Sequence, residues 1–201
     1  ASALTYVWTH DASYGYMKAS AYVGQSYASD SWLMSPLLDL TAAKNPVLTF
    51  DHVTNKFPDL ATAQKQVSLA VSVDGGAWQT RAIPEWSNNA SWTFVNSGNI
   101  DLSAYSGHKI KLGFHYTSQD GVSGTWEIKN IAINGTGVIT ATADSTFPGG
   151  GDTPGPDDPV TPSGDYKGDF NSLNGGEPKS SYGDFTNATG WTATGCNILG
   201  G

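Results

Sequence analysis

Two neighbouring runs of the sequence decide the fold: Lys109-Ile110-Lys111-Leu112-Gly113-Phe114-His115-Tyr116 and Thr125-Trp126-Glu127-Ile128-Lys129-Asn130-Ile131-Ala132-Ile133. Apolar and polar side chains alternate in the first run, which is the period of two of a half-buried strand. The second run begins in the same way, but after Asn130 its apolar positions shift to Ile131 and Ile133. This shift predicts a β-bulge or a change in which face of the strand is covered.

Short strand patterns recur through the first 140 residues. Val67–Val73 alternates and ends at the turn signal Asp74-Gly75-Gly76, with Gln79–Ile83 as its returning partner. Only Pro58–Lys65 suggests a helix, and its strand-like flanks favour a loop with one helical turn. About eight to ten short strands at this spacing predict an all-β, antiparallel jelly-roll sandwich. Four rings are expected to meet in its core: Trp32, Phe50, Phe114 and Trp126.

Composition excludes several classes of function. The net charge of −8, with only ten Lys and Arg among 201 residues, lacks the basic footprint of a nucleic-acid-binding protein. No apolar run approaches the ~20 residues of a membrane span. Cys196 is the single cysteine, so no intrachain disulfide forms, and we expect it to pack as a small apolar group. The chain opens directly into a strand pattern without a signal peptide, which suggests a mature fragment or a piece of a larger protein.

Three segments are predicted. Residues 1–143 form the sandwich domain, and residues 144–165 form a Gly- and Pro-rich linker with too little apolar surface to repay its ordering entropy. Residues 166–201 contain two further strand patterns but are too few to fold alone without disulfides or metal. We interpret them as the truncated start of a second, similar domain, unless they dock on the first.

A family resemblance appears at Ser31–Leu40, whose sequence SWLMSPLLDL is similar to the W-L-I-S-P-x-I-D-L signature of choice-of-anchor J domains. These domains are relatives of the cleaved-adhesin modules of secreted bacterial proteases. Further pieces match in the family's order, together covering residues 4–133: YG with KASAY at 14–22, LTFD at 48–51, IDLSAY at 100–105 and TWEIKN at 125–130. The resemblance implies a jelly roll like those of galactose-binding and MAM domains, an extracellular or bacterial outer-surface location, a tandem arrangement and no catalytic activity.

The chain departs from this family at its start. Family members usually begin with a strand before the region that matches Trp8, of the kind found at Phe170. We therefore predict that residues 169–174 fill the gap by strand addition, in the same molecule or by exchange with a neighbour.

The resemblance also implies a structural calcium ion between the N-terminal loop and the last core strand. The matching positions are Asp11, Asp30 and Glu127, with loop carbonyls supplying further oxygens of the six to eight that Ca²⁺ takes. The alternative is that Glu127 and Lys129 are solvated partners on an outward face.

A carbohydrate site is predicted where Trp86 and Trp92 flank the polar stretch Ser87-Asn88-Asn89-Ala90-Ser91. Aromatic rings stack on sugar faces, and the amides of Asn88 and Asn89 suit sugar hydroxyls. The alternative is that both tryptophans pack beneath a long loop.

The sequence gives little support to an enzyme. The four histidines have no metal-binding spacing, no Gly-x-Ser-x-Gly elbow occurs, and a carboxylate pair such as Asp51 with Glu85 is available in any acidic chain. His52 is in phase with Leu48 and Phe50, which predicts a satisfied, partly buried histidine. We expect a non-catalytic extracellular binding or adhesion module with a glycan or a surface protein as ligand. The alternative is an accessory or spacer domain of a larger secreted hydrolase, without its own ligand.

Overall fold

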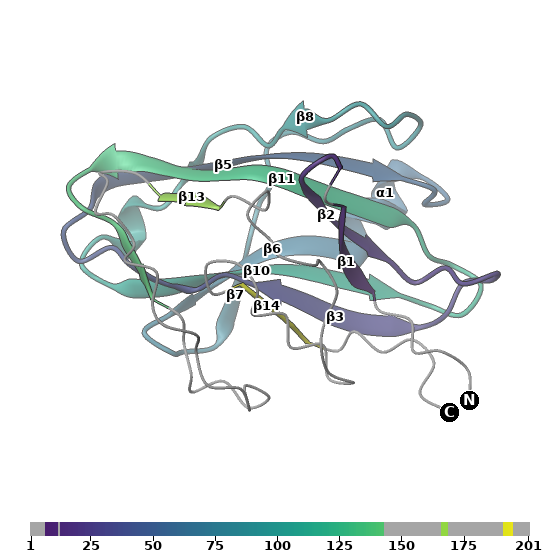
Figure 1. Cartoon of the computed structure of the whole chain (residues 1–201), viewed down its shortest axis with the longest axis horizontal. Helices are drawn as coiled ribbons and strands as arrows, with labels where there is room; N and C mark the ends of the chain where they lie inside the picture. The colour runs from purple at the N-terminus through teal and green to yellow at the C-terminus, as the bar shows by residue number, and fades with distance from the viewer. Residues whose placement is uncertain (1–6, 12, 143–165, 169–190, 195–201) are drawn as a thin grey trace.

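The computed structural model describes residues 7–11, 13–142, 166–168 and 191–194. In chain order, its elements are β1 (Trp8–Asp11), β2 (Tyr16–Ser20), β3 (Ser29–Met34), β4 (Leu37–Asp39), β5 (Lys44–Asn55), α1 (Leu60–Gln66), β6 (Val67–Val73), β7 (Trp78–Arg81), β8 (Val95–Asn96), β9 (Ile100–Asp101), the 3₁₀ turn η1 (Ser103–Tyr105), β10 (Lys109–Ser118), β11 (Thr125–Thr136), β12 (Thr140–Thr142), β13 (Tyr166–Gly168) and β14 (Thr192–Thr194). The strands form two stacked antiparallel sheets (Figure 1), which confirms the predicted all-β sandwich.

The chain alternates between the two sheets. One sheet has the order β1-β2-β11-β5-β8, with β9 also on β5 and β13 on β11. The other has the order β12-β4-β10-β3-β14, with β6 also on β10 and β7 on β6. Because β2, β4, β5 and β10 are each followed by a strand of the opposite sheet, neighbouring strands come from distant parts of the sequence, as in jelly rolls. No helix in the described ranges is long and apolar enough to cross a membrane.

Aromatic rings from both sheets meet between the layers. Phe50 of β5 and Phe114 of β10 lie edge to face with ring centroids 5.2 Å apart, and Trp126 of β11 is 5.7 Å from Phe114. All three side chains are buried. Edge-to-face packing of this kind adds to the stabilisation from buried apolar area.

Trp32, the fourth ring expected in the core, lies instead on the outer face of its sheet. It is opposite His115 in the β3–β10 register, and the two rings stack with centroids 4.0 Å apart. Trp78 stacks on the other side at 4.9 Å, over Gly113, where an added Cβ would come within 2.8 Å of both indoles. In β3 it is Leu33, the partner of Phe114, that points inward. The prediction followed the size of the side chain, whereas the strand's alternation decides which face it occupies.

The predicted β-bulge is confirmed in β11. Its pairing with β5 shifts between Lys129 and Ala132, and Asn130 has a φ of 53°. Asparagine tolerates this left-handed conformation better than most residues. The extra residue brings Ile131 and Ile133 onto the buried face, where the sequence pattern requires them.

The segment Pro58–Lys65, expected to be a loop with one turn, overlaps the seven-residue helix α1, which spans Leu60–Gln66. Asp59 caps it, because its carboxylate accepts a hydrogen bond from the backbone N–H of Thr62 at 2.6 Å. Such a cap satisfies one of the free N–H groups at the start of a helix. With Ala63 buried against the core, the cap and this contact extend the helix beyond the single turn expected.

The described parts of the C-terminal segment pair with the sandwich. β13 lies antiparallel to Ile131–Ile133 of β11, and β14 lies antiparallel to β3 (Figure 1). Trp191, which precedes β14, is fully buried with its ring centroid 6.1 Å from that of Phe114. Residues 169–174, the linker 144–165 and Cys196 lie outside the described residues, so strand exchange through 169–174 and a second domain stay predictions.

His52 is buried between the sheets and is satisfied at both ring nitrogens. Nδ1 accepts a hydrogen bond from the indole Nε1–H of Trp126 at 3.0 Å, which leaves Nε2–H to donate to the carbonyl oxygen of Glu85 at 2.8 Å. This arrangement selects the neutral imidazole. It agrees with the satisfied histidine expected from the sequence.

Acidification is expected to destabilise the domain through His52. Burial lowers the pKa of His52, so below about pH 6.5 the unfolded state binds a proton that the folded state does not. The free energy of unfolding should therefore decrease as the pH falls from 7.5 to 5.5, by at most about 1.4 kcal/mol per pH unit for this one proton. Guanidinium unfolding at several pH values measures the slope. The variant His52→Gln should show a smaller slope, and an equal slope in both proteins would contradict the assignment.

Candidate functional site

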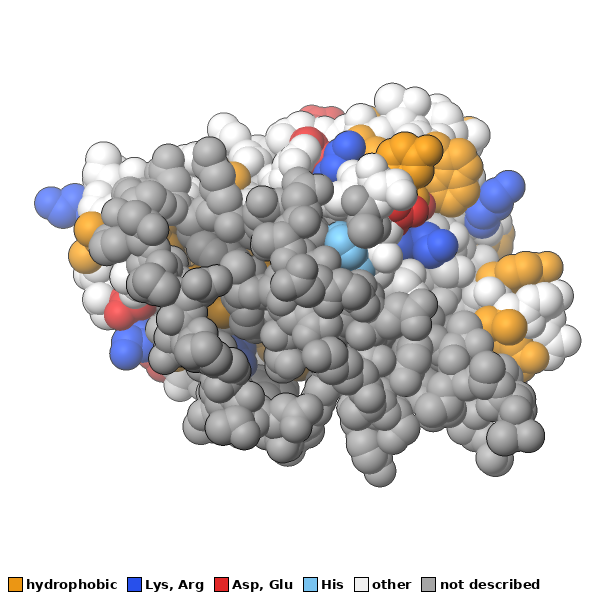
Figure 2. Space-filling model, in the orientation of Figure 1, with side chains coloured by type: hydrophobic (Ala, Val, Ile, Leu, Met, Phe, Trp, Pro, Cys, Tyr) orange, Lys and Arg blue, Asp and Glu red, His pale blue; other side chains and the backbone are white. Residues whose placement is uncertain are grey.

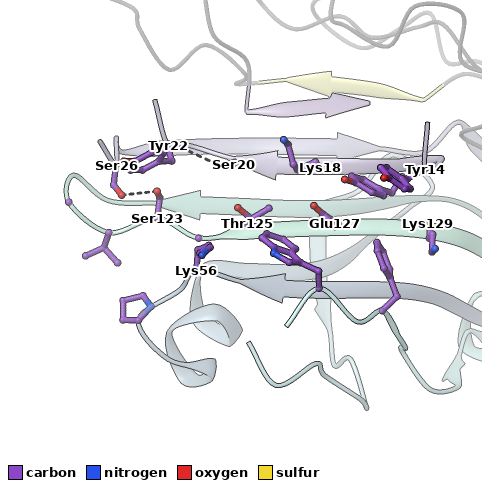
Figure 3. A pocket seen from close by; sticks show the side chains of 17 residues that line it. Tyr14, Lys18, Ser20, Tyr22, Ser26, Lys56, Ser123, Thr125, Glu127 and Lys129 are labelled. Atoms are coloured by element: carbon purple, nitrogen blue, oxygen red, sulfur yellow. Dashed lines mark hydrogen bonds between the residues drawn. The ribbon is translucent and has the colours of Figure 1, made fainter. Parts of the chain in front are cut away.

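A groove runs across the outer face of the sheet that contains β2 and β11. Its floor consists of alternate residues of these strands: Tyr16, Lys18 and Ser20 from β2, and Thr125, Glu127 and Lys129 from β11. Alternate side chains of a strand point to the same face, and the register places Lys18 opposite Glu127 and Ser20 opposite Thr125. Figure 3 shows Thr125, Glu127 and Lys129 following one another along β11. The groove has a volume of about 1120 Å³, large enough for a small organic ligand.

Exposed aromatic side chains line the walls of this groove. Tyr14, Tyr22 and Trp92 are 71%, 63% and 48% exposed. Tyr14 is stacked on Tyr16 with centroids 6.0 Å apart, and Phe94 lies 5.7 Å from Tyr16 on its other side. In the space-filling view, hydrophobic and basic side chains lie close together at the upper right (Figure 2). Large exposed rings in a concave surface are characteristic of a binding site.

One end of the groove is closed by a hydrogen-bonded loop contact. The hydroxyl of Ser123 donates to that of Ser26 at 2.8 Å (Figure 3). Tyr22 lies next to this contact, and its backbone N–H donates to the hydroxyl of Ser20 at 3.3 Å. The Ser123–Ser26 bond joins the β10–β11 loop to the residues after β2, so this end is built from segments about a hundred residues apart.

Glu127 is the carboxylate of the floor, and its side chain is buried. Burial raises the pKa of Glu127, while the charge of Lys18 and the hydroxyl of Tyr16 act in the opposite direction. Burial, followed by the charges of Glu127 and Asp11, raises the pKa of Tyr16 to about 12. The Tyr16 hydroxyl therefore keeps its proton at neutral pH, and it is hydrogen-bonded to the carboxylates of Asp11 and Glu127.

The predicted carbohydrate residues are divided between the groove and the scaffold. Trp92 lines the groove. Trp86 packs its ring against His52, with centroids 5.2 Å apart, and its Nε1–H donates to the carbonyl oxygen of Ile83. Asn89 donates to the carbonyl oxygen of Phe57 at 2.9 Å, and Asn88 accepts a hydrogen bond from the N–H of Ala90. Trp86, Asn88 and Asn89 thus hold the loop that presents Trp92.

The three carboxylates predicted to bind calcium do not converge. Asp11 and Glu127 both adjoin Tyr16, and Oδ1 of Asp11 accepts hydrogen bonds from the N–H groups of Ser13 and Tyr14. Asp30 belongs to the opposite sheet, where its carboxylate lies 2.6 Å from Nε2 of His115. Within the ranges that the structure describes, no group of three or more His, Cys, Asp or Glu is placed to hold a metal ion. The set does not fit one calcium ion, and calcium binding stays a prediction.

Several groove residues are missing from the sequence prediction. Tyr16, Lys18 and Ser20 alternate with buried Met17 and Ala19. Only an extended conformation was predicted there, without a binding role for the outward-facing side chains. The wall residues Tyr14, Tyr22, Lys56 and Phe94 carry no comparable local signal, because loops place them beside the floor.

No protein-family model matches this sequence, and no curated protein is similar enough to count as a relative. The resemblance to choice-of-anchor J domains therefore rests on the quoted residues alone.

Proposed function

We propose that this chain is a non-catalytic, extracellular binding module that holds a carbohydrate in the groove over β2 and β11. The observation that carries the proposal is the exposure of three large aromatic side chains, Tyr14, Tyr22 and Trp92, along one concave polar surface. Exposed rings offer flat apolar faces against which the C–H face of a sugar can stack.

The floor supplies the complementary polar contacts. The hydroxyl of Ser20 can donate a hydrogen bond, the hydroxyl oxygen of Tyr16 can accept one, and the ammonium group of Lys18 donates. Their backbone lies in paired strands of a rigid sheet, so little conformational entropy is lost when a ligand binds. A groove with aromatic walls and a preformed hydrogen-bonding floor satisfies both faces and edges of a sugar ring.

The test is a glycan array of neutral and acidic oligosaccharides, followed by calorimetric titration of the best ligand into two tryptophan variants. Trp92→Ala is expected to weaken binding by at least about tenfold, because it removes one of the three exposed rings against which the sugar is proposed to stack. The matched control is Trp78→Ala, which truncates the same residue type on the outer face of the other sheet. Its affinity should be unchanged.

Two results would contradict the proposal. An array without any binding favours an accessory or spacer domain that has no ligand of its own. Loss of binding in Trp78→Ala but not in Trp92→Ala would move the site to the opposite sheet, where Trp32, Trp78 and His115 stack. Thermal unfolding of each variant shows that a loss of binding is not a loss of fold.

A further inference from the structure

We infer that the carbohydrate held by this groove is a polyanionic glycan, a chain of sugars that carries carboxylate or sulfate groups at intervals. The inference rests on the proposed function, because it names the class of ligand for the same groove. It is carried by a cluster of lysines among the aromatic walls of an otherwise acidic protein.

The groove concentrates positive charge. Lys18, Lys56 and Lys129 line it, which is three of the ten basic residues in a chain with a net charge of −8. Glu127 is the one carboxylate among the described lining residues, and it is largely buried in the floor. An anionic ligand would therefore meet three ammonium groups against one lining carboxylate, which favours its approach to this surface.

The three lysines present their charge beside the groove, although Lys18 and Lys129 also interact electrostatically with Glu127. Lys18 and Lys56 are exposed. Lys129 places its Nζ 4.2 Å from the ring centroid of Phe94, which orients the ammonium group without neutralising its charge.

The lysines are distributed along the groove. Lys56 follows Asn55, which is opposite Thr125 in the β5–β11 register, and Lys129 lies four residues further along β11. Four residues of a strand span roughly 13 Å. Lys18 lies between these ends, opposite Glu127. Because one sugar ring cannot reach both ends, this spacing favours a chain with repeated anionic groups over a single acidic sugar.

The first test compares ligands that differ only in charge. A hexamer of galacturonic acid and its fully methyl-esterified form present the same rings, but only the acid carries carboxylates. The acid is expected to bind at least about tenfold more tightly at low salt, and its advantage should shrink as sodium chloride is added. A sulfated galactan oligomer and its unsulfated parent form the second pair. Preference for the charged member of either pair supports the inference, and the preferred pair identifies the anion.

The second test removes single charges. Lys56→Gln is expected to lower the affinity for the preferred acidic oligomer about twofold to fivefold, with no change for its neutral counterpart. The matched control is Lys44→Gln, because Lys44 is exposed at the start of β5, outside the groove. It should leave both affinities unchanged.

The outcomes distinguish failure of the polyanion inference from failure of carbohydrate binding itself. Equal binding of charged and neutral oligomers, or equal losses in the Lys56 and Lys44 variants, would overturn the polyanion inference and leave carbohydrate binding intact. If none of the four oligomers binds and the glycan array is also silent, carbohydrate binding itself fails.

Discussion

Replacing Trp126 by alanine is expected to lower the free energy of unfolding by about 3–5 kcal/mol, the cost typical of removing a buried aromatic ring. The indole is fully buried and packs between Trp8 of β1 and Phe114 of the opposite sheet, at centroid distances of 6.0 and 5.7 Å. Its loss also leaves Nδ1 of His52 without the donor it has in the folded protein. An unsatisfied buried nitrogen adds to the cost of the cavity. Guanidinium unfolding measures the change.

Two further variants show whether the loss of stability in Trp126→Ala comes from the burial of its ring. Trp92→Ala removes the same side chain from an exposed position, so its effect on stability should stay within about 0.5 kcal/mol. Trp126→Phe keeps an aromatic ring but removes the indole N–H, so it should cost less than the alanine variant and more than Trp92→Ala. Equal stabilities for Trp126→Ala and Trp92→Ala would contradict the placement of Trp126 in the core.

Replacing Trp191 by alanine is expected to have an effect of similar size, about 3–5 kcal/mol. Trp191 is far from the sandwich in sequence, yet its side chain is fully buried and its ring lies 6.1 Å from that of Phe114. β14 follows it immediately and pairs with Trp32–Met34 of β3. The loss should appear as a lower guanidinium midpoint without a change in the steepness of the transition.

A shortened chain that ends at Thr142 provides a second measurement of the same contact. It lacks Trp191, β13 and β14, so it should be at least as destabilised as Trp191→Ala. If both proteins unfold at the same midpoint as the full chain, the C-terminal segment does not contribute to this core. That result would favour the interpretation of residues 166–201 as the start of a separate domain.

The alternation of apolar and polar side chains predicted much of the fold, because it depends only on residues within the same strand. A strand with one buried face must place apolar residues at every second position, and both β6 and β10 follow this rule. The bulge at Asn130 was also visible, since an extra residue shifts the pattern by one. Which face of a strand packs against the core depends less on the strand's own sequence. Trp32 and Leu33 are both large and apolar; in the structure Leu33, opposite Phe114, faces the core, and Trp32 stacks with Trp78 on the outer face.

The candidate site was less accessible to sequence analysis. Trp92 was identified because an exposed ring beside polar residues is a local signal. Its expected partner Trp86 was not placed beside it in the groove, because the ring of Trp86 packs against the buried His52. The lysines could not be grouped, because Lys18, Lys56 and Lys129 are far apart in the chain and only the pairing of β11 with β2 and β5 brings them to one surface.

The sequence by itself determined that this chain builds antiparallel strands, where β11 changes its buried face, and that the molecule is acidic. Those properties depend on residues within one strand or on totals over the chain. Tertiary structure alone decided that Tyr14, Tyr22 and Trp92 share a groove with three lysines, and that Trp191 fills the core beside Phe114. The physical reason is that these contacts depend on pairing between strands that are tens of residues apart. The sequence of a single strand does not specify which strands become its neighbours in the sheet.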